Sequence, residues 1–260
     1  MKDQYAGNIG DFGKYGLLRA LCKGGEVRLG AAWWMTPDDP HSSDGTLVDY
    51  LRSAHPSLRN CDFELFDALA EMVQRGRRSV SSVCELGILP QDTLHHTDFL
   101  VFPTGSQPDQ RMSIRSRWLA GVAAALHDAD LLFADPDNCL SESADILATD
   151  GPKYGAPHEL NDLVAEDKSI LIYHHFDRSV KAPDQLERAA RTLQDALGRA
   201  FRPWTLRFRR EVARGYLISP SERHREMLRY RLDVLLGGPW GTKQHGFATP
   251  HFEETGAADH

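Results

Sequence analysis

The chain has 260 residues, a net charge of −7 at neutral pH and 41% hydrophobic residues. This length is enough for a hydrophobic core without disulfide or metal support, and the negative charge gives no general attraction to nucleic acid. No apolar run approaches the ~20 residues of a membrane-spanning helix, and the N-terminus lacks a signal-peptide pattern. The four cysteines form no CxxC pair, which argues against a zinc cluster or a disulfide framework. We therefore expect a soluble cytoplasmic protein that does not contact a membrane.

Short apolar runs alternate with amphipathic segments along the chain. The expected strands are residues 31–35, 80–85, 99–102, 131–134 and 169–173, followed by a hairpin of 204–209 and 215–219. The expected helices are residues 17–21, 63–75, 115–127 and 184–197. Apolar runs bounded by Pro, Gly or Asp are typical of parallel strands covered on both faces, and alternation with helices requires crossover connections. The sequence therefore predicts an α/β fold with a doubly wound, mostly parallel, Rossmann-like sheet of about seven strands and a late antiparallel hairpin.

The two ends of the chain differ from the rest. We expect one α/β domain over residues 1–245 and a loosely ordered tail over residues 246–260, which are small and polar without periodicity. Residues 7–16 are rich in glycine and lead into a helix. One interpretation is that segment 1–22 packs over a ligand site, with Lys14 and Tyr15 reaching into it. The other is that Asp11 simply caps the helix.

An acidic run, Asp135-Pro136-Asp137-Asn138, follows the fourth expected strand. Ligands of open α/β sheets bind beyond the carboxyl ends of the strands. Two carboxylates, an amide and a rigid proline at such a position predict a site for the polar edge of a substrate or for a metal ion. A plain turn is the alternative, since these residues also favour turns. Lys153 further along the chain is a candidate cation for the same region.

Two histidines, His174 and His175, follow the fifth expected strand. Adjacent residues on a strand point to opposite faces, so both cannot face one metal ion unless the strand has already ended. Histidine titrates near neutral pH, which suits one of them to proton transfer. We select His174 as the candidate, and a structural role at the strand end is the alternative.

The first two expected strands end in further candidates for ligand contact. A polar loop follows the first strand, and within it we select Thr36 and Asp44. The loop has no GxGxxG pattern and no Walker lysine, so neither a dinucleotide nor a P-loop fingerprint is present. Glu85 stands at the end of the second expected strand.

The region from Arg199 to Arg231 contains ten arginines and three glutamates. Such a concentration predicts a surface that faces a polyanion such as nucleic acid. The alternative is that these arginines lie on a solvated hairpin and helix.

These motifs resemble those of known families. The chain resembles a family of uncharacterised bacterial proteins that share a QYxGxIxDxxKYGLLR-type start, a DPDN strand end and a YHHFxR segment, here residues 4–19, 135–138 and 173–178. It is more distantly similar to the bacterial large-subunit ribosomal RNA adenine-N6 methyltransferases. In that family an AGNxxDxxKH helix closes over S-adenosylmethionine and a DPPY motif ends strand four. The matching stretches here are residues 6–15 and 135–138, and the late hairpin with residues 214–220 is also similar.

The chain departs from this second family in three places. Tyr15 stands where the family has histidine, and Asp137 and Asn138 replace the second proline and the aromatic residue of DPPY. The first strand also lacks the family's glycine turn. The ring that would stack on a flipped adenine is therefore missing.

The resemblance implies a class I methyltransferase-like enzyme that uses S-adenosylmethionine and acts on a nucleic acid. Asp135 and the Pro136 carbonyl would accept hydrogen bonds from a target amine, and Glu85 would bind the ribose of the donor. Two alternatives stay open. One is a Mg²⁺-dependent nuclease or other phosphoryl-transfer enzyme, with Mg²⁺ on Asp135 and Asp137 and with Lys153 or His174 near the phosphate. The other is a non-catalytic binding protein on a degraded methyltransferase fold.

Overall fold

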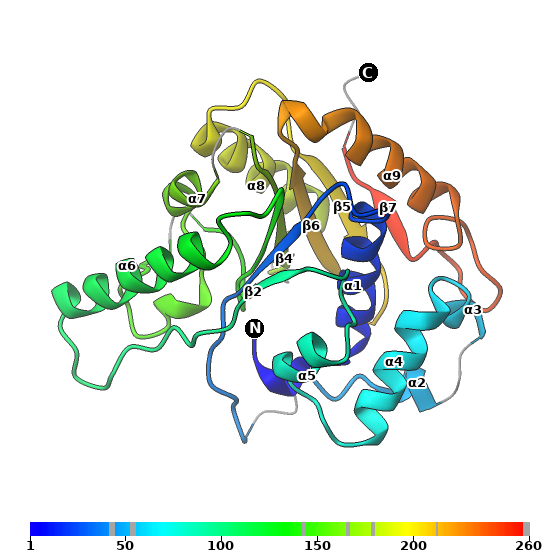
Figure 1. The fold of residues 1–260 in the computed structure, drawn as a ribbon, viewed down its shortest axis with the longest axis horizontal. Helices are drawn as coiled ribbons and strands as arrows, with labels where there is room; N and C mark the ends of the chain where they lie inside the picture. Colours follow the sequence, from blue (N-terminus) through cyan, green and yellow to red (C-terminus); the bar gives the residue numbers. More distant parts are fainter. Residues whose placement is uncertain are drawn as a thin grey trace.

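A mixed β-sheet lies between two groups of helices in the computed structural model (Figure 1). The structure describes residues 1–41, 45–52, 56–141, 144–164, 167–177, 180–211 and 213–256. Within these residues the sheet has seven strands, in the spatial order β2 (Leu94–His96), β1 (Leu29–Trp33), β3 (Leu131–Asp135), β4 (Ser169–His175), β6 (Arg214–Ser219), β5 (Trp204–Phe208) and β7 (Phe252–Glu254). Neighbours among the first four are parallel, whereas β6, β5 and β7 add antiparallel pairs. The expected α/β architecture with a late antiparallel hairpin is confirmed at this level.

The helices divide between the two faces of the sheet. One face is covered by α1 (Ile9–Leu21), α2 (Asp49–Arg52), α3 (Pro56–Arg59), α4 (Phe63–Gln74), α5 (Val80–Glu85) and α9 (Arg225–Gly237). The other face is covered by α6 (Pro108–Ala125), α7 (Pro157–Leu163) and α8 (Ala182–Leu197). Short 3-10 turns are η1 (Asp3–Tyr5), η2 (Gly151–Lys153) and η3 (Glu222–His224). In the described part of the chain, none of the helices combines the length and the apolar content needed to cross a bilayer.

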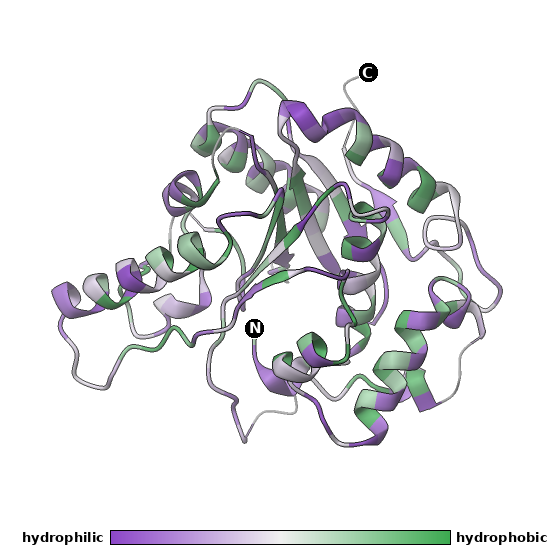
Figure 2. Ribbon diagram, in the orientation of Figure 1, coloured by the Kyte–Doolittle hydropathy of each residue, from purple (hydrophilic) through white to green (hydrophobic). Residues whose placement is uncertain are grey.

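The central strands are buried on both faces. Phe133 and Leu171 pack toward α1, while their neighbours Leu132 and Ile170 pack toward α6–α8. The strands at the middle of the sheet are accordingly mostly green in Figure 2, whereas the outer helices carry both colours. Double coverage explains why these strands are continuous apolar runs without polar alternation.

The strand order reverses between β1 and β3. From β1 the chain passes to β2 on one side, and it then crosses back through α6 to place β3 on the other side. The connections above the carboxyl ends of β1 and β3 therefore diverge, which leaves a crevice where ligands of open α/β sheets bind. The acidic run that begins at Asp135 lies at this switch point.

Three expectations about secondary structure were wrong. Residues 80–85, expected as a strand, form helix α5, because the Ser79 side chain accepts a hydrogen bond from the Ser82 amide and caps it. Residues 99–102 form no ladder in the described structure beyond a bridge between Phe99 and Met35, and the second strand is Leu94–His96 instead. Short apolar runs do not distinguish strand from helix by periodicity alone.

The C-terminal stretch is more ordered than we expected. Phe252–Glu254 forms β7 at the edge of the sheet, with antiparallel pairing to β5. Phe252 is buried against Phe208 and Trp240. A single large aromatic residue therefore anchors a segment whose composition is otherwise typical of a loose tail. Residues 257–260 lie outside the described part.

Candidate functional site

Helix α1 brings the glycine-rich N-terminal stretch against the sheet. Asn8 caps the helix by accepting hydrogen bonds from the amides of Gly10 and Asp11, so the expectation that Asp11 is the cap was wrong. A Cβ atom on Gly13 would lie 2.7 Å from the Phe208 ring, and one on Gly16 would lie 2.3 Å from Trp240. The glycines therefore permit a close approach of the helix to its neighbours.

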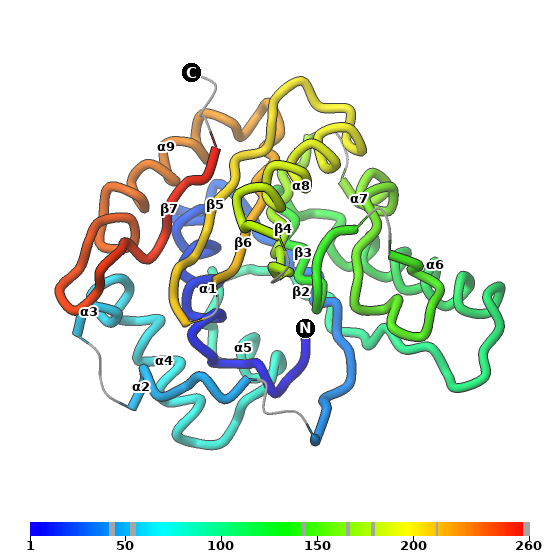
Figure 3. The backbone as a smooth tube through the Cα atoms, turned by 180° about the vertical axis from the view of Figure 1, so that it is seen from behind, coloured from blue at the N-terminus to red at the C-terminus, as the bar shows by residue number. Residues whose placement is uncertain are grey.

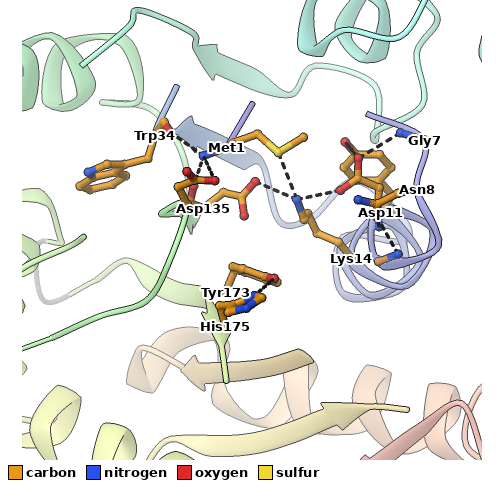
Figure 4. A network of polar contacts seen from close by, with 12 residues as sticks. Met1, Gly7, Asn8, Asp11, Lys14, Trp34, Asp135, Tyr173 and His175 are labelled. Atoms are coloured by element: carbon orange, nitrogen blue, oxygen red, sulfur yellow. Dashed lines mark hydrogen bonds and ion pairs between the residues drawn. The ribbon is translucent and has the colours of Figure 1, made fainter. Parts of the chain in front are cut away.

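This close packing carries Lys14 to the carboxyl end of β3. Its Nζ lies 2.8 Å from Asp135 Oδ2 and 2.9 Å from Asp11 Oδ1 (Figure 4). The Lys14 and Asp135 side chains are 4% and 2% exposed. Asp11 also accepts hydrogen bonds from the Gly7 amide and the Tyr15 hydroxyl. One ammonium group thus bridges two buried carboxylates that are far apart in the sequence.

Aromatic rings surround the Lys14 ammonium. Its Nζ lies 5.4 Å from the centroid of the Tyr173 ring, 5.7 Å from that of Tyr15 and 5.8 Å from that of Trp33. Ring faces stabilise a desolvated cation at such distances. Burial alone lowers the pKa of Lys14, but the adjacent carboxylates of Asp11 and Asp135 outweigh burial and raise it. Lys14 therefore stays protonated.

The pKa of Asp135 shifts in the direction expected of two carboxylates that share one cation. Burial raises the pKa of Asp135, and the positive charges of Lys14 and of the Met1 amino group only partly oppose it. Burial likewise raises the pKa of Tyr173. The carboxyl end of β3 is thus a low-dielectric environment in which added charge interacts strongly.

Residue Met1 occupies the crevice between β1 and β3. Its amino nitrogen lies 2.6 Å from the Trp34 carbonyl oxygen and 3.4 Å from that of Asp135. Its carbonyl oxygen accepts a hydrogen bond of 2.9 Å from the Thr36 amide, and its sulfur lies 3.7 Å from Lys14 Nζ. The two strand ends thus present carbonyl acceptors to one amino group.

Asp137 has spare bonding capacity beside this crevice. Its Oδ2 accepts a hydrogen bond from the Thr36 hydroxyl at 3.3 Å. Its buried Oδ1 has no hydrogen-bond partner among the described residues, and the Met1 amino nitrogen lies 3.8 Å away from it. A buried carboxylate oxygen without a partner costs free energy, which marks this position as one that favours a bound donor.

The predicted residues around this crevice come together. Lys14, Asp135, Asp137 and Thr36 are linked by the contacts above, and Tyr15 joins them through Asp11. Pro136 is buried between the two aspartates. Asn138 serves through its backbone, since its amide donates to the Lys153 carbonyl and its carbonyl accepts from the His175 amide. The Lys153 backbone therefore does lie in the same region, as expected.

His174 does not join them. Asp135, Tyr173 and Trp33 face α1, whereas His174 lies on the opposite face, where it contacts Phe176. Burial, with a smaller contribution from the charge of His175, lowers the pKa of His174 to about 4. The adjacent His175 is the histidine near the crevice, with its Nδ1 3.3 Å from the Tyr173 hydroxyl. Sequence alone could not choose between the two, because the choice depends on the register of β4.

Two further predicted contacts have different outcomes. Glu85 ends helix α5 instead of a strand, and its carboxylate pairs with Arg77 and Ser81. The acidic residue that follows the true second strand is Asp98, which is largely exposed. Asp44 lies outside the described residues.

Several residues near Asp135 were not selected from the sequence. Tyr173, Tyr216 and Arg214 lie close enough for their charges to influence one another. The buried Tyr216 hydroxyl has no hydrogen-bond partner in the described part of the chain. The pairing of Tyr173 with Tyr216 across β4 and β6 brings them together, and only the tertiary register reveals it.

The arginine-rich region divides between the two edges of the sheet. Pairing of His175 with Arg214 places the β5–β6 turn at the same edge as Asp135. Pairing of Ile170 with Ser219 places the following η3 at the opposite edge. Many of the arginines bind groups of the protein itself, as the contacts of Arg199, Arg202, Arg209, Arg210, Arg229 and Arg231 illustrate.

Two surface hollows lie elsewhere. One, of about 570 Å³, is lined by Thr104, Asp109 and Arg117 at the start of α6. The other, of about 410 Å³, is lined by His158 and Asp195 between α7 and α8. Neither is lined by Asp135 or Lys14. Among the described residues no group of three or more His, Cys, Asp or Glu side chains is arranged to hold a metal ion.

Comparison with known proteins adds no relative, since no protein family and no curated protein matches this sequence. The functional conclusion therefore depends on the geometry of the crevice between β1 and β3.

Proposed function

We propose that this protein is a class I methyltransferase-like enzyme that binds S-adenosylmethionine in the crevice between β1 and β3 and acts on a nucleic acid. The observation that carries the proposal is the contact of Lys14, from the N-terminal helix, with Asp135 at the switch point of the sheet. The strand order, with a β6–β5 hairpin beyond β4, gives further support. An ion pair that joins the first helix to the acidic strand end is the contact that the motif resemblance leads one to expect.

The residues of the crevice fit the amino end of this donor. The Trp34 and Asp135 carbonyl oxygens and the free Oδ1 of Asp137 are three acceptors around one position, which the Met1 amino group occupies. A donor amine at this position would satisfy the unpartnered Asp137 oxygen. S-adenosylmethionine supplies an electrophilic methyl group. The protein's contribution is to position a nucleophile against it.

Lys14 and Asp135 have a positioning role in this proposal. The Lys14 ammonium fixes the Asp135 side chain, so that the Asp135 and Pro136 carbonyls are held at the rim for a target amine. Asp98, two residues after β2, takes the ribose-binding role that we had expected of Glu85. No aromatic residue follows Asp137, so the substrate is proposed as a nucleic acid without a specified base.

The nucleic-acid part of the proposal draws on the β5–β6 turn. This turn carries Arg209 and Arg210 at the edge of the sheet where Asp135 lies. Phosphate contacts from arginines at that edge would place a strand across the crevice. The exposed Arg223 lies at the opposite edge and has no part in this.

Calorimetric titration with S-adenosylmethionine and S-adenosylhomocysteine tests the proposal. We expect binding by the wild type and at least tenfold weaker binding by Asp137→Asn, because the amide replaces one acceptor oxygen with a donor. Asp195→Asn, a carboxylate in the hollow between α7 and α8, is the matched control and keeps wild-type affinity. Absence of heat and of a thermal shift at millimolar ligand would refute donor binding. Transfer of a labelled methyl group to RNA or DNA then tests the activity.

A non-catalytic binding protein is the second candidate. The observation that favours it is that Met1 and Lys14 fill the crevice. Ligand binding without turnover of any RNA or DNA substrate would favour this candidate over the enzyme.

A further inference from the structure

Residues 1–7 run along the crevice as one segment that lies between the sheet and α5 (Figure 3). The Met1 side chain is 3% exposed, and Lys2 is also buried. Met1 bonds to the ends of β1 and β3 through its amino nitrogen and its carbonyl oxygen. This segment therefore covers the acceptors to which the proposed function assigns the ligand.

The outer part of the segment is held by a few side chains. Arg78 donates to the carbonyl oxygens of Ala6, Gln4 and Gly45 at 2.8, 2.5 and 2.5 Å. Asp3 accepts a hydrogen bond of 2.8 Å from the Val80 amide at the start of α5. Arg78 is thus the central fastening point of residues 1–7.

The segment differs in kind from the elements it covers. Apart from the single turn η1 it belongs to no helix or strand, so its opening breaks side-chain contacts and leaves the sheet ladder intact. Segments held in this way open at lower free energy than the core does. Burial also lowers the pKa of the Met1 amino group and of Arg78, so the closed position strains both cations and favours release.

We propose that residues 1–7 form a releasable cover whose closed position, seen here, excludes ligands from the crevice between β1 and β3. The identity of the ligand rests on the proposed function, whereas the existence of the cover does not. If the open form is a minor population, the apparent affinity for a ligand falls in proportion to that population. A change that favours opening tenfold should then strengthen binding up to tenfold.

Hydrogen–deuterium exchange tests the cover without any ligand. The Thr36 amide is a direct reporter because it donates to the Met1 carbonyl. In Arg78→Gln we expect at least tenfold faster exchange at Thr36 and within residues 1–8, with unchanged exchange in β3 and β4. Arg75→Gln, which removes an exposed arginine paired with Glu71, is the matched control and should exchange like the wild type. Asp3→Asn is a milder second variant for use if Arg78→Gln folds poorly.

Binding of S-adenosylhomocysteine to the same variants tests exclusion. Faster exchange at Thr36 together with up to tenfold tighter binding supports the proposal. Faster exchange with equal or weaker binding overturns exclusion, and so does exchange at Thr36 that changes only together with β3 and β4. Faster local exchange with no binding to any variant supports the cover but removes the donor from the proposed function.

Discussion

Two buried ionic clusters lie on opposite faces of the sheet and differ in what they leave unsatisfied. On the α6–α8 face, Arg115 pairs with Glu159 and also donates to the carbonyls of Gly151 and Tyr154. Glu159 accepts in addition from the Ala156 amide. On the α1 face, Lys14 sits between two carboxylates. Beside it the Asp137 oxygen lacks a partner within the described residues.

This difference separates a structural clamp from a candidate site. The Arg115 cluster uses both Glu159 oxygens and fixes the loop between β3 and α7. The Lys14 cluster combines an excess of carboxylate groups with an incompletely satisfied acceptor at a switch point. Burial of charge by itself therefore does not identify function, since both clusters are buried. The unused bonding capacity does.

The largest expected effect comes from Lys14→Met, which leaves Asp11 and Asp135 buried without their cation. We expect a loss of about 5 kcal/mol at neutral pH, at the upper end of the cost of breaking a buried pair. Because burial raises the pKa of Asp135, the folded variant binds protons that the unfolded chain does not, and its loss relative to wild type shrinks toward about pH 5. Urea denaturation at both pH values measures this. A loss that does not depend on pH would contradict it.

Arg115→Met breaks the structural clamp. Its expected cost is about 4 kcal/mol, and the double variant Arg115→Met/Glu159→Met should recover about half of this because no unpaired charge remains. The measurement is the free energy of unfolding in urea. The comparison between the clusters fails if the double variant is less stable than Arg115→Met alone.

The pH dependence of stability sharpens the contrast between the two faces at His174. Burial lowers the pKa of His174 to about 4, so above the unfolded value this residue costs nothing. As the pH falls from about 6.5 to about 4, the unfolded chain gains a proton that the folded one refuses, and stability of the order of 3 kcal/mol is lost. His174→Asn should remove this part of the acid slope. The exposed His158→Asn serves as a control, and an equal effect of both would refute the assignment.

The smallest effect concerns the caps of two helices. Asn8→Ala and Ser79→Ala each remove an N-cap, of α1 and α5 respectively, and each should cost about 1 kcal/mol. Only Asn8→Ala loosens the helix that carries Lys14, so only it should also weaken binding of S-adenosylhomocysteine. Thermal unfolding and titration separate the two effects. Equal loss of binding in both variants would mean that the position of α1 is not specific to the site.

Some features were predictable because they are local. The apolar run before Asp135 is long and bounded by proline, so β3 and the acidic corner after it follow from composition and turn chemistry. The hairpin of β5 and β6 and the helices α4, α6 and α8 follow in the same way from their periodicity. The weak runs at residues 80–85 and 99–102 were misassigned, because a helix cap and the pairing of β1 with Leu94–His96 decide their structure.

The sequence by itself determined the alternation of strands and helices and the presence of carboxylates at a strand end. Only the tertiary structure decided which side chains meet there. The register of β4 put Tyr173 and His175 on the α1 face and His174 on the other, and the glycines of α1 let Lys14 reach Asp135 across 121 residues. The physical reason is that faces and contacts depend on register and close packing between distant segments, which no local pattern encodes.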